Sequence, residues 1–443
     1  MFSNKDLRKL IIPLVIEQLL AVTIGMADTV MVSSCGEAAV SGISLVDSIN
    51  FLLITLFSSL ATGGAVIASQ YIGRGDHKSA SLAAKQLFYA SLALSAVLGI
   101  IAVFFRKPVL NMVFGSIEAD VMAHAQIYFL LSAISYPFLA VYNAGAALFR
   151  SMGDSRTTML ISILMNTINI VGNAILIYGF QMAAAGAATA SLVSRAVGAI
   201  IITVLLLNPH RIIFYDKLHK PEIHLSMLKS ILQIGVPNGL ENSIFQIGKI
   251  LVASIVSGFG TISITANAVA GNLASLQVIP GMALRMAMIT VVGQCIGAKD
   301  YEAVKKYTKK LMLITYGVVW AMTLLMLLFS KQILSFYSLS EETTTMTMEV
   351  FIVHGICAVI VWPLAFALPN ALRAANDVRF TMIVSLLSMW IFRIGFSYIL
   401  AIYFNMGILG TWIAMCIDWF CRGACFVIRF ARGKWKNISF IDN

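Results

Sequence analysis

The amino-acid sequence predicts an all-α membrane protein whose twelve transmembrane helices form two parallel repeats of six. Three observations support this prediction: an apolar composition, a series of long apolar runs, and motifs that recur in the second half of the chain. Of the 443 residues, 59% are hydrophobic and 12% are charged, and the mean hydropathy is +0.88. A soluble domain of this size needs about twice that charged share to cover its surface. The composition therefore excludes soluble enzymes and nucleic-acid-binding proteins.

Twelve apolar runs are long enough to cross a bilayer as helices, which takes about 20 mostly apolar residues each. They lie approximately at 7–32, 40–72, 80–105, 120–149, 157–179, 183–207, 228–257, 262–296, 303–330, 345–372, 380–404 and 407–429. The first run follows Lys5, Arg8 and Lys9 as in a signal peptide, but it is too long and lacks a small-residue cleavage site. We expect it to remain as the first spanning helix.

The distribution of basic residues predicts the orientation in the membrane. With the N-terminus in the cytoplasm, 23 lysine and arginine residues fall on the cytoplasmic side, whereas only Arg106, Lys107 and Lys331 fall outside. Cytoplasmic loops of membrane proteins carry such an excess. We therefore expect a multi-pass protein of the plasma (inner) membrane with both termini in the cytoplasm. The net charge of +11 then faces anionic lipid and requires no nucleic acid as a partner.

Motifs of the first half recur in the second half after a shift of 224 residues. In order, the shift superimposes Pro13 on Pro237, Glu17 on Glu241, QYIGRGD (70–76) on QCIGAKD (294–300), and Gly186 on Gly410. With a one-residue gap, ALFRSMGD matches ALRAAND, which pairs Arg150 with Arg373 and Asp154 with Asp377. Because the shift spans six helices, an even number, the halves are parallel repeats. We expect an N-terminal lobe, a cytoplasmic linker and a C-terminal lobe at 1–207, 208–227 and 228–443, with the substrate bound between the lobes.

The sequence contains no motif of an ATPase, a metalloenzyme or a nucleophilic enzyme. A GxxxxGK[ST] loop that would cradle nucleotide phosphates is missing, as are HExxH and paired catalytic acids. The six cysteines lie mostly inside apolar runs. Cys421 and Cys425 share a helix face, but no histidine or carboxylate cluster completes a metal site beside them. We expect no enzymatic activity and no cofactor.

Ionisable side chains at membrane depth cost about 2.5–3.5 kcal/mol each on insertion scales, which makes them candidates for function. Ten acidic or basic residues are expected at that depth: Glu17, Asp28, Asp47, Arg195, Glu241, Lys249, Arg285, Arg393, Asp418 and Arg422. Asp28, in GMADTVMV, lies deep in the first run. A carboxylate at that depth can exchange a proton or hold a bare cation, which predicts a coupling-ion site. The alternative is a carboxylate near the outer end of a tilted helix, paired with a neighbour.

Two further features of the first half bear on Asp28. Pro13, fifteen residues earlier on the same run, removes a backbone hydrogen bond. A bend there would move Asp28, although a passive kink is the alternative.

On the fifth run, Asn166, Asn169 and Asn173 recur at spacings of three and four. This stripe can supply carbonyl ligands to Na⁺ or hydrogen bonds to a protonated carboxyl, or it can join helices.

In the second half, Glu241 lies one turn after Pro237. It could attract a cationic substrate or carry a second proton, or it could pair with Lys249 or another buried base. We expect Glu241, Asn166 and Tyr136 to contact the substrate. The spacing of Asp418 and Arg422 predicts a salt bridge within one helix. His354 either gates proton flow or packs as a hydrogen-bonded core residue.

Together these motifs resemble the multidrug and toxic compound extrusion (MATE) transporters. The resemblance covers about residues 5–430 and is carried by four features: the proline and aspartate of the first helix with GMADTVMV, the two repeated blocks, NIVGNAILIYG, and AAGAATAS. It implies export of organic cations, driven by inward H⁺ or Na⁺, as two six-helix lobes rock around a central cavity. Small organic cations and membrane lipids are then the expected partners of a monomer.

In similar proteins, the N-lobe cation site combines the first-helix aspartate with two polar residues on the fifth helix and a hydroxyl on the sixth. The resemblance places these at Asp28, Asn169, Asn173 and Ser191. One branch has an aspartate in place of Asn173, which argues here against a mechanism with two shared carboxylates. Another branch has C-lobe acids where this chain has Phe245 and Trp362. A C-lobe cation site would thus be absent or rebuilt around Glu241, which favours H⁺ at Asp28 over Na⁺.

The alternative function is a flippase for lipid-linked precursors, since related two-lobed folds move oligosaccharide lipids. Such a protein needs a strongly cationic cavity to hold pyrophosphate. Five of the basic residues at membrane depth would suit it: Arg195, Lys249, Arg285, Arg393 and Arg422.

Overall fold

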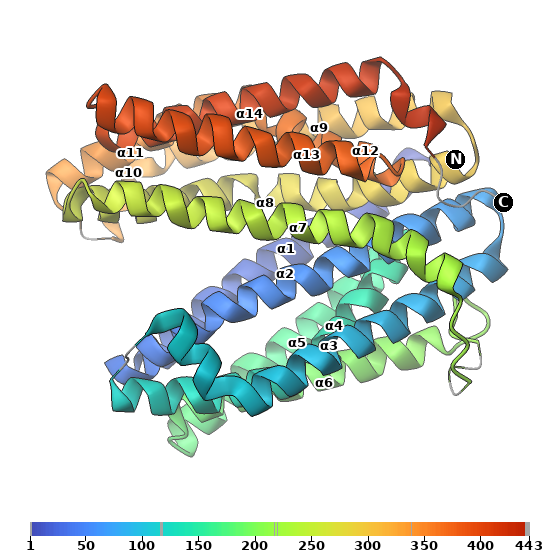
Figure 1. Ribbon diagram of the computed structural model, residues 1–443, viewed down its shortest axis with the longest axis horizontal. Coiled ribbons are helices and arrows are strands. Elements are labelled where there is room, and N and C mark those ends of the chain that lie inside the picture. Colours follow the sequence, from blue (N-terminus) through green and yellow to red (C-terminus); the bar gives the residue numbers. More distant parts are fainter. Residues whose placement is uncertain (1, 116–117, 217, 219, 338, 439–443) are drawn as a thin grey trace. The chain divides into compact units, whose positions relative to one another are not determined.

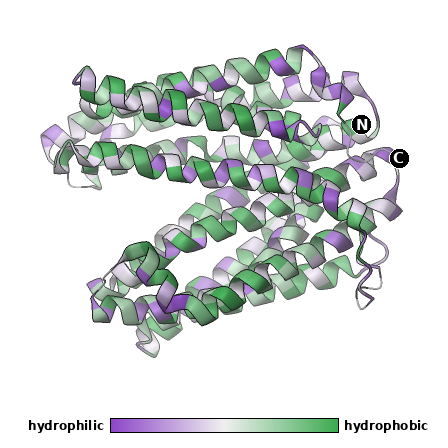
Figure 2. Cartoon of the chain, viewed as in Figure 1, coloured by the Kyte–Doolittle hydropathy of each residue, from purple (hydrophilic) through white to green (hydrophobic). Residues whose placement is uncertain are grey.

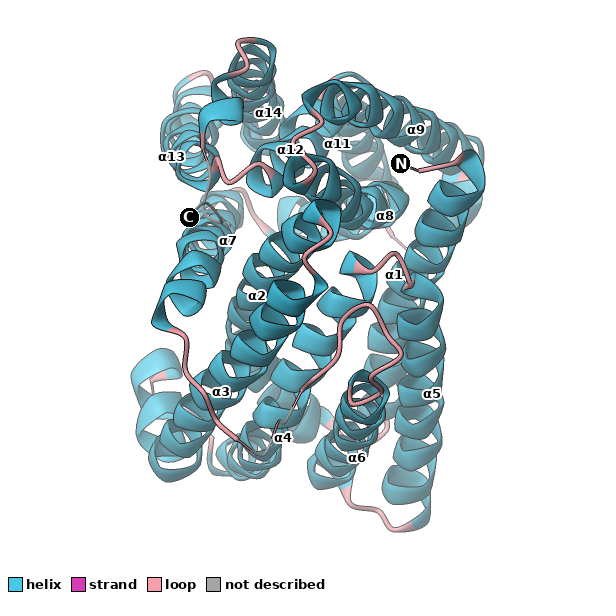
Figure 3. Cartoon of the chain, turned by 90° about the vertical axis from the view of Figure 1, so that its right-hand side faces the viewer, coloured by secondary structure: helices cyan, strands magenta, loops and turns pink. Residues whose placement is uncertain are grey.

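The computed structural model describes residues 2–115, 118–216, 218, 220–337 and 339–438. Throughout these residues the chain is helical, with loops and turns between helices and no strand (Figures 1 and 3). Twelve of the described helices are long and apolar enough to cross a membrane. The prediction of an all-α membrane protein with twelve spanning helices is therefore confirmed.

The chain divides into two compact units. The first, called the N-terminal lobe, covers Phe2–Gly239, and the second, called the C-terminal lobe, begins at Leu240. This division by packing falls inside one helix, and the predicted limits of 1–207, 208–227 and 228–443 stay a prediction. The N-terminal lobe contains α1 (Asn4–Ser33), α2 (Glu37–Arg74), α3 (His77–Phe114), α4 (Ala119–Ser151), α5 (Ser155–Asn173), the π-helical segment η1 (Ala174–Gly179) and α6 (Ala183–Leu206).

Helix α7 (Leu225–Ser257) contains the division, and its second half belongs to the C-terminal lobe. The rest of that lobe comprises α8 (Thr261–Gly297), α9 (Tyr301–Leu328), α10 (Ser330–Ser335), α11 (Glu341–Ile360), η2 (Pro363–Ala367), α12 (Leu368–Ala374), α13 (Val378–Ser388), η3 (Met389–Gly395), η4 (Tyr398–Tyr403), α14 (Gly407–Ala431) and η5 (Lys434–Asn437). Segments η2, η3 and η4 are π-helical. Because π-helical turns shift the direction of the side chains around them, they frequently mark functional sites.

The repeated motifs mark where helices begin. Asp76 and Asp300, which correspond in the repeat, cap α3 and α9 by accepting the backbone N–H groups of Ser79 and Ala303 at 3.0 and 2.9 Å. A side-chain acceptor at this position satisfies one of the unpaired N–H groups of a helix N-terminus. The hydrogen bonds from Ser79 hold the pKa of Asp76 below its ordinary value.

The repeat also places equivalent ion pairs in the two lobes. In the N-terminal lobe, Glu17 of α1 pairs with Arg150 of α4 at 3.2 Å. In the C-terminal lobe, their counterparts Glu241 of α7 and Arg373 of α12 pair at 2.6 Å. The repeated acids Asp154 and Asp377 also form ion pairs, with Arg211 at 3.4 Å and with Arg429 at 2.6 Å, but these two bases do not correspond in the repeat. The repeated pair of glutamate and arginine therefore braces corresponding helices within each lobe.

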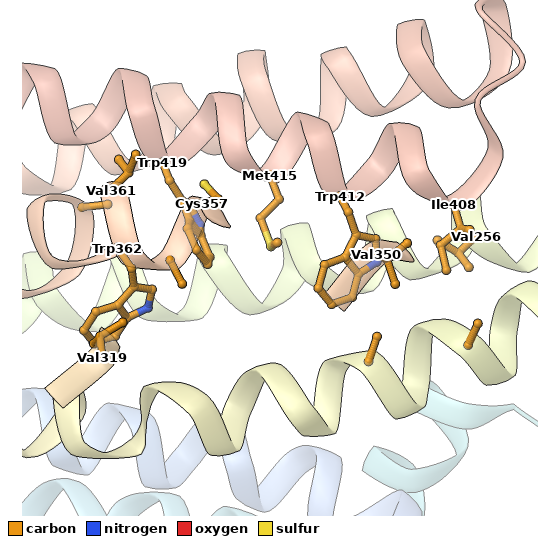
Figure 4. Packing of buried hydrophobic residues seen from close by; sticks show 14 residues of the cluster. Val256, Val319, Val350, Cys357, Val361, Trp362, Ile408, Trp412, Met415 and Trp419 are labelled. Atoms are coloured by element: carbon orange, nitrogen blue, oxygen red, sulfur yellow. The ribbon is translucent and has the colours of Figure 1, made fainter. Parts of the chain in front are cut away.

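Hydrophobic residues predominate along the helices of both lobes (Figure 2). They include buried residues and many exposed ones. The C-terminal lobe has a buried cluster in which Trp362, Trp412 and Trp419 pack with Val319 and Val350 (Figure 4). Many large apolar residues on the surface are exposed, for example Phe104, Met112 and Trp320. An apolar surface of this extent is costly in water and is the expected exterior of a protein that spans a bilayer.

Pro13 lies inside α1, where it has no N–H to donate to the carbonyl of Lys9. Pro237 occupies the corresponding place in α7. The predicted bending of α1 at Pro13 stays a prediction.

Candidate functional site

The structure brings together the four residues that the resemblance assigned to a cation site. Asn173 donates from Nδ2 to the Asp28 carboxylate oxygen Oδ1 at 2.6 Å. Its neighbour one turn earlier on α5, Asn169, donates from Nδ2 to Ser191 Oγ at 3.0 Å. Asn173 Nδ2 also lies 3.4 Å from Asn169 Oδ1. Helices α1, α5 and α6 thus meet in one hydrogen-bonded group, which we call the Asp28 site.

One hydrogen-bond acceptor in the Asp28 site has no donor. The oxygen Oδ1 of Asn173 is buried and has no hydrogen-bond partner among the described residues. A buried carbonyl oxygen without a donor is unfavourable and calls for an explanation. It lies on the same amide that touches Asp28. A proton on Asp28 or a cation beside it would give this oxygen a partner.

The oxygens of the Asp28 site suit a hard cation. They comprise the Asp28 carboxylate, the amide oxygens of Asn169 and Asn173, and the Ser191 hydroxyl. Hard cations prefer such oxygen ligands. No group of three or more histidines, cysteines or carboxylates that could hold a metal ion occurs within the described part of the chain.

A second polar network adjoins this site in the same lobe. Asp47 of α2 accepts hydrogen bonds from Tyr128 at 3.0 Å and from Asn50 at 3.2 Å. Arg195 of α6 interacts electrostatically with both Asp28 and Asp47, and the two carboxylates also interact. Sequence reasoning included Asp47 among the buried charges but gave it no role. The spacing of three residues between Asp47 and Asn50, which places both on one face of a helix, could have indicated this network.

The predicted substrate residues Tyr136 and Asn166 differ in accessibility. Tyr136 is fully buried, and its hydroxyl donates to Asn50 at 2.7 Å. This contact gives Tyr136 a packing role in the lobe. Asn166 is partly exposed, and its Nδ2 has no hydrogen-bond partner among the described residues. Contact of either residue with a substrate stays a prediction.

Glu241 forms an ion pair with a buried base, as the alternative interpretation expected, but the base is Arg373 and not Lys249. The pair is buried, and Arg373 also donates to Asn370 at 3.0 Å. Glu241 therefore does not offer a free negative charge. Its equivalence to Glu17 indicates a bracing role shared by the two lobes.

The remaining C-terminal candidates are also hydrogen-bonded. The predicted salt bridge between Asp418 and Arg422 is confirmed, with contacts of 3.0 and 3.1 Å. His354 is buried, its Nδ1 lies 2.8 Å from Gln277 Oε1, and its ring stacks on Phe351. These contacts agree with the packing interpretation of His354.

The family model MatE matches residues 13–175 and 237–399, which are the two repeats. The chain is 28% identical over 436 residues to the uncharacterised transporter YisQ of Bacillus subtilis, covering 96% of this chain and 93% of the relative. It is 26% identical to the probable multidrug resistance protein NorM of Thermotoga maritima, covering 98% and 93%.

Two solved structures share the fold at 21% identity, each covering 98% of this chain and 97% of the other. One is a multidrug resistance MATE family transporter in an outward-facing conformation, with a TM-score of 0.89. The other is a transporter of the MOP superfamily from Pyrococcus furiosus, described by the reverse polarity of its binding pocket, with a TM-score of 0.87. With both repeats matched by the family model, the chain belongs to the MatE family of multidrug and toxic compound extrusion transporters.

Proposed function

We propose that the protein is a secondary active antiporter that exports cationic or amphipathic organic compounds in exchange for a cation taken up at Asp28, preferably H⁺. The contact between Asp28 and Asn173, with the unpaired Asn173 oxygen beside it, carries this proposal. The relatives described as probable multidrug resistance proteins support small organic cargo. We place the protein in the plasma membrane as a monomer with both termini in the cytoplasm.

The amide of Asn173 responds to the charge of Asp28. When Asp28 is ionised, the amide donates from Nδ2, as observed. When Asp28 is protonated, the carboxyl becomes a donor, and rotation of the amide presents Oδ1 to it. Asn169 contacts the same amide and Ser191, so that the change extends to α6. Ionised Asp28 would accompany cargo loading, and protonation from outside would accompany release.

Na⁺ is the second coupling ion that this site can accept. Na⁺ would be bound by oxygen atoms alone: those of the Asp28 carboxylate and the amide and hydroxyl oxygens near it. Asn173 supplies a neutral oxygen, so the site carries one carboxylate charge. A single protonatable carboxyl with a neutral acceptor favours H⁺.

The flippase alternative rests on basic side chains. The transporter from Pyrococcus furiosus, which shares this fold, is described by the reverse polarity of its binding pocket. Of the five bases considered for pyrophosphate, Arg422 is paired with Asp418, and Arg195 lies near two carboxylates. The remaining three, Lys249, Arg285 and Arg393, lie in the C-terminal lobe.

Transport by reconstituted vesicles tests the antiport proposal. Asp28→Asn removes the titratable charge and retains the side-chain shape, so we expect efflux driven by a pH gradient to fall at least tenfold while expression and folding persist. Asp120→Asn, which neutralises an exposed carboxylate in the same lobe, is the matched control and should retain efflux. Unchanged efflux by Asp28→Asn would remove Asp28 from the coupling mechanism.

A further inference from the structure

We propose that the C-terminal lobe binds an anionic group of the exported compound through a cluster of basic side chains. The cluster comprises Lys249, Arg285 and Arg393, supported by Arg373 and Arg422. The ligand is an amphipathic organic anion that carries a carboxylate, sulfonate or phosphate beside an aromatic surface. This inference rests on the proposed transport function and specifies its cargo.

The cluster has more positive than negative charge. Arg373 pairs with Glu241 and Arg422 pairs with Asp418. No ion pair involves the other three bases in the described portion of the chain, so the excess is three positive charges. Uncompensated charges at membrane depth are costly, and an anion would offset that cost.

Electrostatic interactions link the five bases in series. Arg285 of α8 interacts electrostatically with Arg373, Glu241 and Arg422. The side chain of Arg393, in the π-helical segment η3, interacts with Arg422 and Asp418. Lys249 of α7 interacts with Arg393 in turn. Five elements, α7, α8, α12, η3 and α14, therefore bring their positive charges into a single group within the C-terminal lobe.

The cluster combines buried donors with reachable ones. Arg373 and Arg422 are 4% and 3% exposed, whereas Arg285 and Arg393 are partly exposed and Lys249 is exposed. The Nε atoms of Arg373, Arg393 and Arg422 are buried and lack hydrogen-bond partners among the described residues. Unpaired guanidinium donors suit the oxygens of a carboxylate or phosphate, which bind arginine with two parallel hydrogen bonds.

Aromatic rings lie next to the charges. The guanidinium carbon of Arg393 lies 5.8 Å from the ring centre of Phe245, and that of Arg422 lies 5.4 Å from the same ring. Phe366 contacts both Phe245, edge-on, and Arg422. A flat apolar ligand that carries one anionic group would match this combination of rings and cations.

Comparison of the repeats shows that these bases are not needed to form a lobe. At the shift of 224 residues, Lys249, Arg285 and Arg422 correspond to Gly25, Ala61 and Gly198. In the opposite direction, the N-terminal acids Asp28 and Asp47 correspond to Val252 and Gly271. The bracing pair of Glu241 and Arg373, by contrast, occurs in both lobes. The charges that are not repeated are therefore acidic in the N-terminal lobe, at the cation site, and basic in the C-terminal lobe, at the proposed anion site.

Binding of two dyes with the same ring system tests the inference. Fluorescein is an organic anion at neutral pH, and rhodamine 123 is a cation on the same xanthene scaffold. The full chain, purified in nanodiscs of zwitterionic phosphatidylcholine, is titrated with each dye and followed by fluorescence anisotropy. We expect the protein to bind fluorescein at least tenfold more tightly than rhodamine 123. Because no ion gradient is applied, failure of coupling at Asp28 leaves this result unchanged.

Variants identify the residues that bind the anion. Arg393→Gln and Arg285→Gln should each weaken fluorescein binding at least tenfold, whereas Arg393→Lys should retain part of it. Arg379→Gln, which removes an exposed charge of the same lobe, is the matched control and should bind as the wild type does. If an Arg285 or Arg393 variant fails to fold, Lys249→Gln replaces it, since Lys249 is exposed. Tighter binding of rhodamine 123, or fluorescein binding that none of these variants weakens, would overturn the inference.

The anion could also come from a lipid headgroup. A second titration therefore uses nanodiscs that contain phosphatidylglycerol. For anionic cargo, fluorescein affinity should change less than threefold. Loss of fluorescein binding that depends on the phosphatidylglycerol content would assign the cluster to lipid and overturn its assignment to cargo.

Discussion

The substitution Glu241→Gln removes one charge from the ion pair with Arg373, and it separates the two roles considered for this carboxylate. If Glu241 braces the lobe, its loss lowers the free energy of unfolding. If Glu241 attracts a cationic substrate, its loss lowers the affinity for that substrate and leaves stability nearly unchanged. The two repeats provide an internal comparison, because Glu17 and Arg150 form the equivalent pair.

The expected magnitude follows from burial. The side chains of Arg373 and Glu241 are 5% and 9% exposed, and their atoms lie 2.6 Å apart. Removing one partner of a buried pair leaves an uncompensated charge and costs about 3–5 kcal/mol. Glutamine keeps one acceptor for Arg373, so we expect the lower end, about 3 kcal/mol. The pair of Glu17 and Arg150 is longer, at 3.2 Å, and more exposed, and Glu17→Gln should cost about 1 kcal/mol.

Denaturant unfolding in detergent micelles measures these differences. Labelling of the buried thiol of Cys295 in α8 reports the unfolding of the C-terminal lobe. The double variant Glu241→Gln/Arg373→Gln should lose less stability than the sum of the single losses, since neither side chain then leaves a charge unpaired. Full stability of Glu241→Gln combined with loss of cation affinity would refute the bracing role.

Two further predictions concern the coupling site and the repeated caps. Asn173→Ala removes the donor to Asp28, so efflux driven by a pH gradient should fall at least tenfold. The control Asn208→Ala, outside the spanning helices, should retain efflux. Equal efflux by both variants would contradict the role of the amide. Asp76→Ala and Asp300→Ala each remove a helix cap and should each lower the free energy of unfolding by about 1 kcal/mol. Because the pKa of Asp76 is lowered by folding from an ordinary value of 3.8, its contribution is fully present above that value and disappears as the pH falls through the lowered one. A loss of stability by Asp76→Ala that is larger at acidic than at neutral pH would contradict this sign.

Much of the fold follows from the sequence because apolar length and repetition are properties of the chain itself. The repeat analysis matched Glu17 with Glu241 and Arg150 with Arg373, but it did not show that each acid meets the base of its own lobe. Lys249 or another buried base was the expected alternative partner of Glu241, and the sequence did not identify which base it is. Eight residues along a helix span about 12 Å, which is too far for an ion pair of adjacent side chains. The true partner lies on α12, 132 positions away.

The candidate site was predictable only in part. The spacing of Asn169 and Asn173 places both on one face of α5, and the resemblance added Asp28 and Ser191. The network around Asp47 depends on how α2 and α4 are rotated against each other, since Tyr128 lies 81 positions from Asp47. The periodicity of residues along one helix does not reveal how that helix is rotated against its neighbours. The excess of bases in the C-terminal lobe likewise emerged only when their partners could be identified.

Separate ion gradients across reconstituted vesicles test the coupling claim most directly. Substrate efflux and proton flux are recorded together, first with a pH gradient alone and then with a Na⁺ gradient alone. Our account predicts efflux with the pH gradient, accompanied by inward proton flux that disappears in Asp28→Asn. Efflux driven only by Na⁺, or proton flux that persists without the Asp28 carboxylate, would contradict it.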